Sequence, residues 1–573
     1  MATSTTLAGA AAVSARGSRR AWAVLAVILT AVFMQLLDTT VTMVGVPSIQ
    51  ADLGASYGEV QLVVAGYTLA FACVLVTGGR LGDTYGRKRA FLWGMVGFTA
   101  ASAWCGAAPN AVTLVVARVV QGTFSGLMFT QVLGIIQVIF SRAQRAKALA
   151  FYGATIGLAT ILGPVTGGAL IDWDIAGSGW RSIFYVNVPI GLAALAFGVL
   201  VIPESRVPRA NRIDLTGAVL LGAGLFLLVL PLAIGRDHDW PAWSLASMAI
   251  SPFVLAAFAG YERRRTRRDD QPLIDTRLFR QRPFTLGLIA CLVFFTGIPS
   301  FFMILLMTLQ AGLGYSPVKA GLVTLGFALG MAIGSARSAV LTRHLGTRVL
   351  VAGCVLMLVG QGFVIATLHW VDVDLSGWHL LAPMFVAGLG GGFFLAPVTN
   401  VVLAGIQAKD AGSASGALAT AQQVGMAVGV AVVGVIFFGL LGSNAASSID
   451  SATPRLHADL SAAGLPAASQ QHVLDGFRTC FDDRAHAKDP AGVPTSCRAV
   501  EQQVAHSPAS PAVKAAVRTA VLGHAAPAAR TDDFVQSFRA ALWWHIGVFA
   551  LALLLVARLP KLRLDGTDLT PTG

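Results

Sequence analysis

Long apolar blocks separated by short polar segments fill the chain from residue 21 to residue 558. Most blocks hold about 20 residues, the length that a helix needs to cross the ~30 Å hydrocarbon layer of a bilayer. A segment in lipid must satisfy its own backbone hydrogen bonds, so we expect each block to be an α-helix. The pattern predicts fourteen membrane spans, at residues 21–46, 60–79, 90–108, 112–137, 148–171, 183–202, 213–233, 243–261, 284–309, 319–341, 349–368, 379–403, 414–441 and 540–558.

The composition agrees with a polytopic all-α membrane protein. Only 12% of the 573 residues are Asp, Glu, Lys or Arg, about half the share of a soluble globular protein. The mean hydropathy is +0.70. The polar, basic residues 1–20 precede an apolar run that contains Asp38. We therefore interpret them as a cytoplasmic tail before the first span, not as a cleaved signal peptide.

The distribution of Lys and Arg predicts the orientation of the spans. With the N-terminus inside, the inner segments and span ends carry 28 basic residues and the short outer loops carry 3. Basic residues gather on the cytoplasmic side of membrane proteins, so both termini should be cytoplasmic in a plasma membrane protein. The net charge of +13 then reflects orientation and contact with membrane lipid, and we expect no nucleic-acid partner.

Two polar regions interrupt the regular alternation of spans and short loops. Residues 262–282 include the run RRRTRR, which we interpret as an anchor on anionic lipid rather than as a site for a specific partner. Residues 442–539 form a predicted outer loop, rich in Ala, Ser and Pro, with an amphipathic stretch near Val473, Leu474 and Phe477. We expect an extracellular hairpin or cap that is partly disordered.

The cysteines and the missing signatures narrow the chemistry. Cys480 and Cys497 are the two cysteines outside the spans and share the outer loop, where conditions favour a disulfide. The chain contains no Gly-Lys dipeptide and no HExxH, so we predict neither an ATP motor nor an enzyme. No cofactor and no metal site are expected.

Two charges lie well inside predicted spans. Asp38 is ~12 Å and Arg118 ~9 Å from the outer ends of their helices, at 1.5 Å per residue. A charge within the membrane is expensive and marks a functional site by default. Asp38 can therefore be a group that binds and releases a proton, with Arg118 setting its affinity. The alternative is a permanent ion pair that holds the helices together.

The loop after the second span is the most specific motif. It could be an ordinary basic turn, but its residues fit the pattern GxLxDxxGRK, the signature loop of the major facilitator superfamily, which this sequence resembles. The residues that we expect to act as a conformational gate are Gly79, Asp83, Gly86, Arg87, Lys88 and Arg89.

Other motifs follow in the order of that superfamily. The fourth span holds Arg118 and Gln121-Gly122, like RxxQG, and the first holds Leu37-Asp38-Thr39-Thr40 and Pro47, like the LDxT…P motif of fourteen-span drug/proton antiporters (the EmrB/QacA type). The fifth span resembles the antiporter motif GPxxGG through Gly163, Pro164, Gly167 and Gly168. The family usually has Asn near Met43 and Trp near Leu62, so its substrate range need not carry over.

The resemblance implies two six-helix bundles of inverted repeats, plus two inserted spans, with the substrate site between the bundles. It divides the chain into a tail (1–20), an N-terminal bundle (21–202), the inserted spans with their basic linker (203–283), and a C-terminal bundle (284–573) that includes the outer loop (442–539). The polar residues that we expect to line the cavity are Tyr67, Gln121, Gln131, Gln310, Asn400 and Gln423.

The predicted function is proton-coupled efflux of hydrophobic or amphipathic drugs or metabolites. The antiporter motif in the fifth span disfavours the first alternative, a proton-coupled importer of a small organic solute. The second alternative is a non-transporting receptor or scaffold that binds a partner through the outer loop. The charges inside the membrane argue against a receptor or scaffold. Such charges are costly, and binding a partner through the outer loop does not require them.

Overall fold

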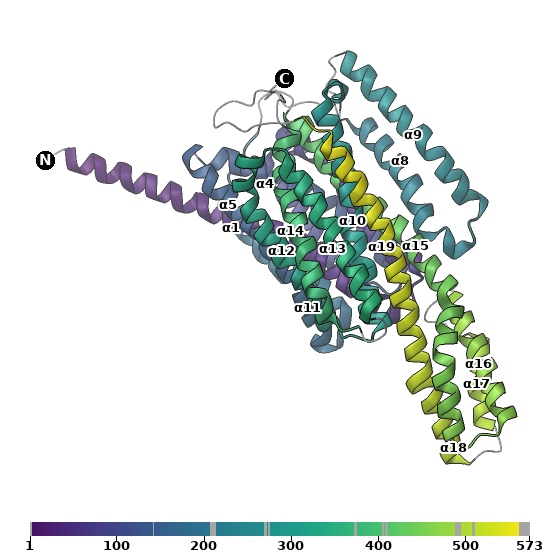
Figure 1. The fold of residues 1–573 in the computed structure, drawn as a ribbon. Helices are drawn as coiled ribbons and strands as arrows, with labels where there is room; N and C mark the ends of the chain where they lie inside the picture. The colour runs from purple at the N-terminus through teal and green to yellow at the C-terminus, as the bar shows by residue number, and fades with distance from the viewer. Residues whose placement is uncertain are drawn as a thin grey trace.

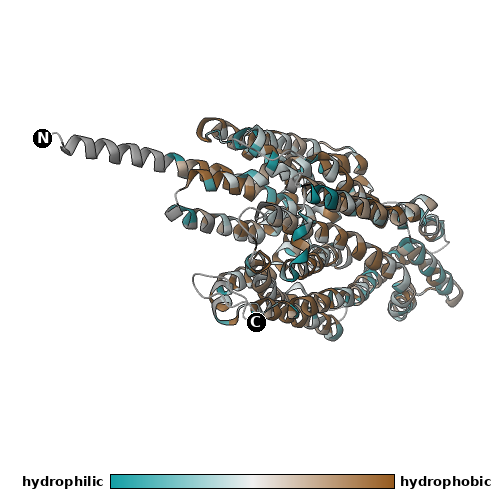
Figure 2. Cartoon of the chain, turned by 90° about the horizontal axis from the view of Figure 1, so that it is seen from above, coloured by the Kyte–Doolittle hydropathy of each residue, from teal (hydrophilic) through white to brown (hydrophobic). Residues whose placement is uncertain are grey.

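The computed structural model describes residues 3–140, 142–206, 214–268, 272, 275–371, 375–403, 406, 411–486, 494–506 and 510–560. Within these residues the chain is helical and contains no strand (Figure 1). The predicted all-α fold class is therefore confirmed. Apolar residues predominate along the long helices, as expected of elements that face lipid and one another (Figure 2).

Helices occupy all fourteen predicted span positions. The first half contains α1 (Thr3–Leu53), α2 (Tyr57–Tyr85), α3 (Arg87–Gly106), α4 (Ala111–Ile139), α5 (Arg142–Asp172), α6 (Ser182–Tyr185), α7 (Asn187–Val201), α8 (Leu215–Ile234) and α9 (Ala242–Arg267). The second half contains α10 (Arg282–Met307), α11 (Pro317–Val323), α12 (Leu325–Leu345), α13 (Arg348–Val371), α14 (Gly377–Val402), α15 (Ala411–Ala462), α16 (Ala467–His486), α17 (Thr495–His506), α18 (Pro511–Arg518) and α19 (Ala526–Ala557).

Twelve helices in the described residues are long and apolar enough to cross a membrane, or up to thirteen if the bent α5 counts as one span. The bend of 44° in α5 separates Phe151–Thr160 from Leu162–Asp172. Pro164 explains it, because its ring clashes with the carbonyl four residues earlier and its nitrogen has no hydrogen to donate. The structure is thus close to the predicted fourteen spans but does not establish that number.

The membrane helices have two ends, which we name by the segments found there. The terminal side carries the loop between α2 and α3 and the end of α19 at Ala557. The extension side carries residues 442–539, here called the extension. In Figure 1 the extension projects from one end of the molecule, and the hairpin of α8 and α9 stands beside the remaining helices.

The two halves repeat one packing arrangement. In the first half α5 packs on α1, and a Cβ added at Gly163 would lie 1.8 Å from Thr40 Oγ1. In the second half α15 packs on α10, where a Cβ added at Gly429 would lie 2.1 Å from the backbone oxygen of Thr296. Small residues allow such close approach of membrane helices. These pairs agree with the internal repeat that the family resemblance implied.

The inserted helices are tied to α2 on the terminal side. Asp214, just before α8, is fully buried, accepts a hydrogen bond from Tyr261 and lies 2.9 Å from Arg265 Nη1. Arg80 of α2 donates to the backbone oxygen of Pro272. Burial lowers the pKa of Arg80, and the nearby carboxylates of Asp214 and Glu262 oppose that shift. Part of the basic linker thus has protein partners, which the lipid-anchor interpretation did not include.

The extension is a folded helical unit. α15 continues past the predicted end of its span at 441 as far as Ala462. α16 and α18 pack beside it, and α17 packs on α16. Ile449, Leu456, Leu474, Phe477 and Val517 are buried together in its core. The amphipathic stretch predicted near Phe477 is therefore the inner face of α16. The predicted partial disorder is wrong for the described residues of the extension, because their apolar faces bury one another.

Candidate functional site

Asp38 and Arg118 meet inside the N-terminal bundle. The Asp38 side chain is fully buried and that of Arg118 is 1% exposed, and Arg118 Nη1 lies 2.5 Å from Asp38 Oδ2. Arg118 Nη1 also donates to Gln121 Oε1 at 2.6 Å, and Gln121 Nε2 donates to Asp38 Oδ1 at 2.8 Å. Asn187 Nδ2 donates to the same Oδ1 at 3.0 Å. Three side chains therefore hold the carboxylate as an acceptor.

Five helices contribute to this network. Arg118 Nε donates to the backbone oxygen of Val63 on α2, and the guanidinium carbon lies 4.1 Å from the ring centre of Tyr67. The Tyr67 hydroxyl shares a hydrogen bond with Ser125 on α4. Ser102 on α3 accepts from Gln121, and α1 and α7 supply the carboxylate and the amide. A buried ion pair with this many partners can order the bundle as well as carry chemistry.

Sequence reasoning missed the amide beside the carboxylate. Asn187 lies in the sixth apolar block and is fully buried, and its Oδ1 has no protein hydrogen-bond partner in the described residues. The sequence feature that could have revealed Asn187 was a single amide inside an apolar block. Burying a polar side chain is costly unless it forms hydrogen bonds.

The gate loop is held by two acids. Arg87 donates to Asp83 Oδ1 at 2.8 Å and to the backbone oxygen of Gly134 on α4. Glu204 accepts from the backbone nitrogen of Lys88 and lies 3.7 Å from Arg89 Nε. The acid at the N-terminus of α3, where the helix field favours negative charge, is thus Glu204 rather than Asp83.

Two glycines of the loop differ in their surroundings. Gly86 has a φ of 109°, and a Cβ there would lie 2.4 Å from Glu204 Oε1. This backbone conformation disfavours other residues, as the motif requires. A Cβ at Gly79 would meet no atom within 4 Å, so this face of α2 is open.

The antiporter-motif helix contacts both halves of the molecule. Gly163 and Gly167 of α5 pack on α1, while a Cβ at Gly168 would lie 2.6 Å from backbone atoms of Val318 at α11. In return a Cβ at Gly321 would lie 2.5 Å from the backbone oxygen of Pro164. This motif therefore forms part of the contact between the halves on the extension side.

Three candidates for cavity lining lie elsewhere. Tyr67 and Gln121 are buried in the Asp38 network. Gln131 is 1% exposed, donates to the backbone oxygen of Gly78 and packs on Gly82, so it joins α4 to α2. These three residues are not cavity lining in this structure, because the hydrogen-bonding needs of their polar groups are met between helices.

The other three lining candidates remain accessible. Gln310 is half-buried, lines a cavity on the extension side and donates to the backbone oxygen of Val44. Asn400 is exposed and Gln423 is half-buried.

The disulfide predicted in the outer loop is present. Cys480 and Cys497, in the extension, are joined by a disulfide.

Comparison with known families decides the identity of the fold. Residues 28–430 match the model of the Major Facilitator Superfamily, which is more than half of the chain. The chain belongs to this superfamily.

Curated relatives of this superfamily member cover most of its length. The Probable actinorhodin transporter of Streptomyces coelicolor is 40% identical over 542 residues, which are 94% of this chain and 92% of that protein. The Tetracenomycin C resistance and export protein of Streptomyces glaucescens is 34% identical and covers 76% of this chain and 79% of its own.

A solved structure shares the fold. The bacterial homolog of the human lysosomal transporter Spinster, in its inward-facing and unoccupied conformation, superposes with a TM-score of 0.56 at 16% identity. The match covers 94% of this chain and 97% of that one.

The two bundles of this transporter are closed against each other on the extension side. Tyr57 of α2 stacks on Phe438 of α15 with ring centres 4.0 Å apart, and a Cβ at Gly434 would lie 2.2 Å from the Gln61 side chain. The described contacts therefore hold the two bundles together on the extension side.

Proposed function

We propose that the protein exports hydrophobic or amphipathic drugs or metabolites in exchange for protons. The observation that carries this proposal is a buried carboxylate paired with a buried guanidinium. It occurs in a superfamily member whose relatives include a probable actinorhodin transporter and a tetracenomycin C resistance and export protein. The terminal side would be cytoplasmic, as the distribution of basic residues favours. The energy source would be the proton gradient of the plasma membrane, with no cofactor.

A physical route connects the proposed proton site to the contact between the bundles. Asp38 lies two residues before Thr40, and Thr40 packs against Gly163 of α5. Five residues further along α5, Gly168 contacts α11 of the other bundle. A change in the bonding of Asp38 would therefore move α1 against α5, and α5 bears directly on the closed face.

Protonation would change the bonding of Asp38 in a defined way. The carboxylate accepts hydrogen bonds from Arg118, Gln121 and Asn187. A protonated carboxyl must donate one bond, and the Asn187 Oδ1 atom is a buried acceptor without a protein partner. Rotation of the Asn187 amide would turn Oδ1 toward Asp38. The protonated carboxyl could then donate to Oδ1 while the other hydrogen bonds of the network persist.

The test is efflux from energised cells. Cells that express the protein should lose a panel of amphipathic dyes faster than cells without it, and a protonophore should abolish the difference. Dye uptake driven by the proton gradient would instead indicate an importer. Equal retention of every dye and drug, with the protein present in the membrane, would contradict the proposal.

The gate loop gives a second expected result. Asp83→Asn removes the ion pair between Asp83 and Arg87, whose side chains are 37% and 17% exposed, respectively. Such a pair contributes little stability, so expression and substrate binding should stay near the wild-type level. We expect turnover to fall about tenfold, because Asp83 would act when the terminal side closes, against the N-terminal end of α15 near residues 413–416.

A matched control separates this role from a loss of charge. Arg206→Gln removes an exposed cation on the same side of the membrane but outside the loop. Its turnover should stay within twofold of the wild type. Transport by Asp83→Asn at the wild-type rate would reduce the loop to a structural anchor.

A further inference from the structure

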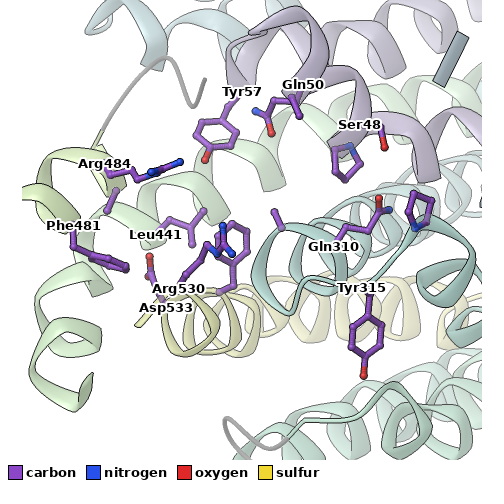
Figure 3. Close-up of a pocket in the computed structure, with 16 residues that line it drawn as sticks. Ser48, Gln50, Tyr57, Gln310, Tyr315, Leu441, Phe481, Arg484, Arg530 and Asp533 are labelled. Atoms are coloured by element: carbon purple, nitrogen blue, oxygen red, sulfur yellow. The ribbon is translucent and has the colours of Figure 1, made fainter. Parts of the chain in front are cut away.

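A cavity of about 590 Å³ lies on the extension side, where three parts of the chain meet. The N-terminal bundle supplies Gln50 and Tyr57, and the C-terminal bundle supplies Gln310 and Tyr315. The extension adds a third wall, which Figure 3 shows around Phe481 and Arg484. A volume of this size falls in the range of sites for small organic ligands.

Contacts between the bundles border the cavity. Tyr57 lines it and also stacks on Phe438, which closes the bundles beside it. Gln310 lines it and donates to the backbone oxygen of Val44 at 2.9 Å. A molecule in this cavity would therefore lie next to the contact that must open for export on this side.

The accessible charge in the cavity is positive. Arg484 of α16 and Arg530 of α19 are exposed, and neither forms an ion pair or hydrogen bond within the described residues. Both guanidinium groups line the same cavity, and the positive charge of Arg484 acts on Arg530. The acid that faces them, Asp533, is 4% exposed, and its Oδ1 accepts from Ser537 at 3.4 Å. The extension thus adds two like charges that have no ion-pair or hydrogen-bond partner among the described residues.

Aromatic side chains form part of the cavity wall. Tyr57, Tyr315 and Phe481 line the cavity and are half-buried, so part of each side chain stays accessible. In Figure 3 the Arg484 side chain extends toward Tyr57. Arginine binds carboxylates through two parallel hydrogen bonds, and aromatic rings bind flat apolar surfaces. One molecule with both features would satisfy both parts of the cavity.

We propose that this cavity is an outer binding site for an amphipathic aromatic acid. The inference rests on the proposed function in one respect, because the ligand would be the exported molecule or a close analogue after release. The walls come from both bundles and from the extension, so the complete site exists when the extension side is closed. A ligand stabilises the state that binds it. Product that accumulates outside would therefore slow its own export.

Binding of a defined probe tests the site. The probe is 2-naphthoate, titrated calorimetrically into the full-length protein in nanodiscs of phosphatidylcholine, which supplies no anionic headgroup of its own. The neutral analogue 2-naphthylmethanol should bind at least tenfold more weakly. Arg484→Gln and Arg530→Gln should each weaken naphthoate binding about tenfold, and the double variant about 100-fold, as expected for lost charged hydrogen bonds.

A control variant keeps the net charge equal to that of the single variants. Arg455→Gln removes an exposed cation from the same extension but outside the cavity, and it should bind naphthoate within twofold of the wild type. Naphthoate added on the extension side should slow dye efflux by the wild type and not by the Arg484→Gln, Arg530→Gln double variant. Equal naphthoate binding by the double variant and the wild type would overturn the proposal.

The outcomes separate this site from the proposed function. Naphthoate binding that depends on Arg484 and Arg530, in a protein that exports no dye, would support the site and contradict proton-coupled export. Protonophore-sensitive export without naphthoate binding would leave the export function standing and overturn the site.

Discussion

Replacing Asp38 with asparagine is expected to abolish uphill, proton-driven efflux. Asparagine keeps the shape of the side chain and can still accept from Gln121, but it cannot take up or release a proton. In reconstituted vesicles, substrate-induced proton release should fall to background, and efflux should no longer respond to the pH gradient. Passive exchange down a substrate gradient should persist, because the described side-chain hydrogen bonds of Asp38 all lie within the N-terminal bundle.

Loss of stability could imitate this result. Asp38→Asn leaves the guanidinium of Arg118 buried at 1% exposure without its counter-ion, and breaking a buried pair costs about 3–5 kcal/mol. The double variant Asp38→Asn, Arg118→Gln removes both charges and avoids this penalty. It should be as abundant in the membrane as the wild type and should still fail to couple transport to protons.

A second acid on the same helix is the matched control. Asp52 of α1 lies at the extension side, accepts from Trp180 and Arg181, and is 50% exposed. Asp52→Asn should keep proton-driven efflux. Uphill efflux and proton release by folded Asp38→Asn would show that the Asp38–Arg118 pair is a structural ion bridge, the alternative that the sequence left open.

The Asp38–Arg118 contact could be predicted because the depth of a residue within a membrane helix follows from its number of residues from the helix end. Each residue adds 1.5 Å, so two charges at similar depth on different spans are candidates to meet. Counting does not fix which face of a helix points where. For this reason the sequence did not identify Asn187 or Ser102 as partners, and it assigned Tyr67 and Gln131 to a cavity when both pack between helices.

The extension was the least predictable region. Its fold depends on contacts distant in sequence, such as those that bury Leu456 beside Leu474 and Val517. Many alanines and few large apolar residues gave a weak helical pattern, and α15 crosses the predicted membrane boundary at 441 without a break. The two cations of the outer cavity, Arg484 and Arg530, are 46 positions apart and meet only because α16 and α19 pack on α15.

Gly168→Val should block transport by holding the extension side open. A Cβ at this position would lie 2.6 Å from backbone atoms of Pro317 and Val318, which cannot move aside as a flexible side chain can. Overpacking of this kind costs about 1–3 kcal/mol, so the closed arrangement should lose about 5- to 150-fold in population relative to the open one.

The change in population can be measured at Gln61, which is 2% exposed and packed against Gly434 across the closed contact. In a Gln61→Cys background, Gly168→Val should make the new thiol react at least fivefold faster with an impermeant maleimide added from the extension side, and efflux should fall below a tenth of the wild-type rate. Gly547→Val places the same side chain on the exposed face of α19, where an added Cβ meets no atom within 4 Å. It should leave both maleimide labelling and efflux near the values of the parent protein. If Gly168→Val transports as fast as Gly547→Val, the contact between α5 and α11 does not govern closure, and the antiporter-motif glycines serve only the packing of α5 on α1.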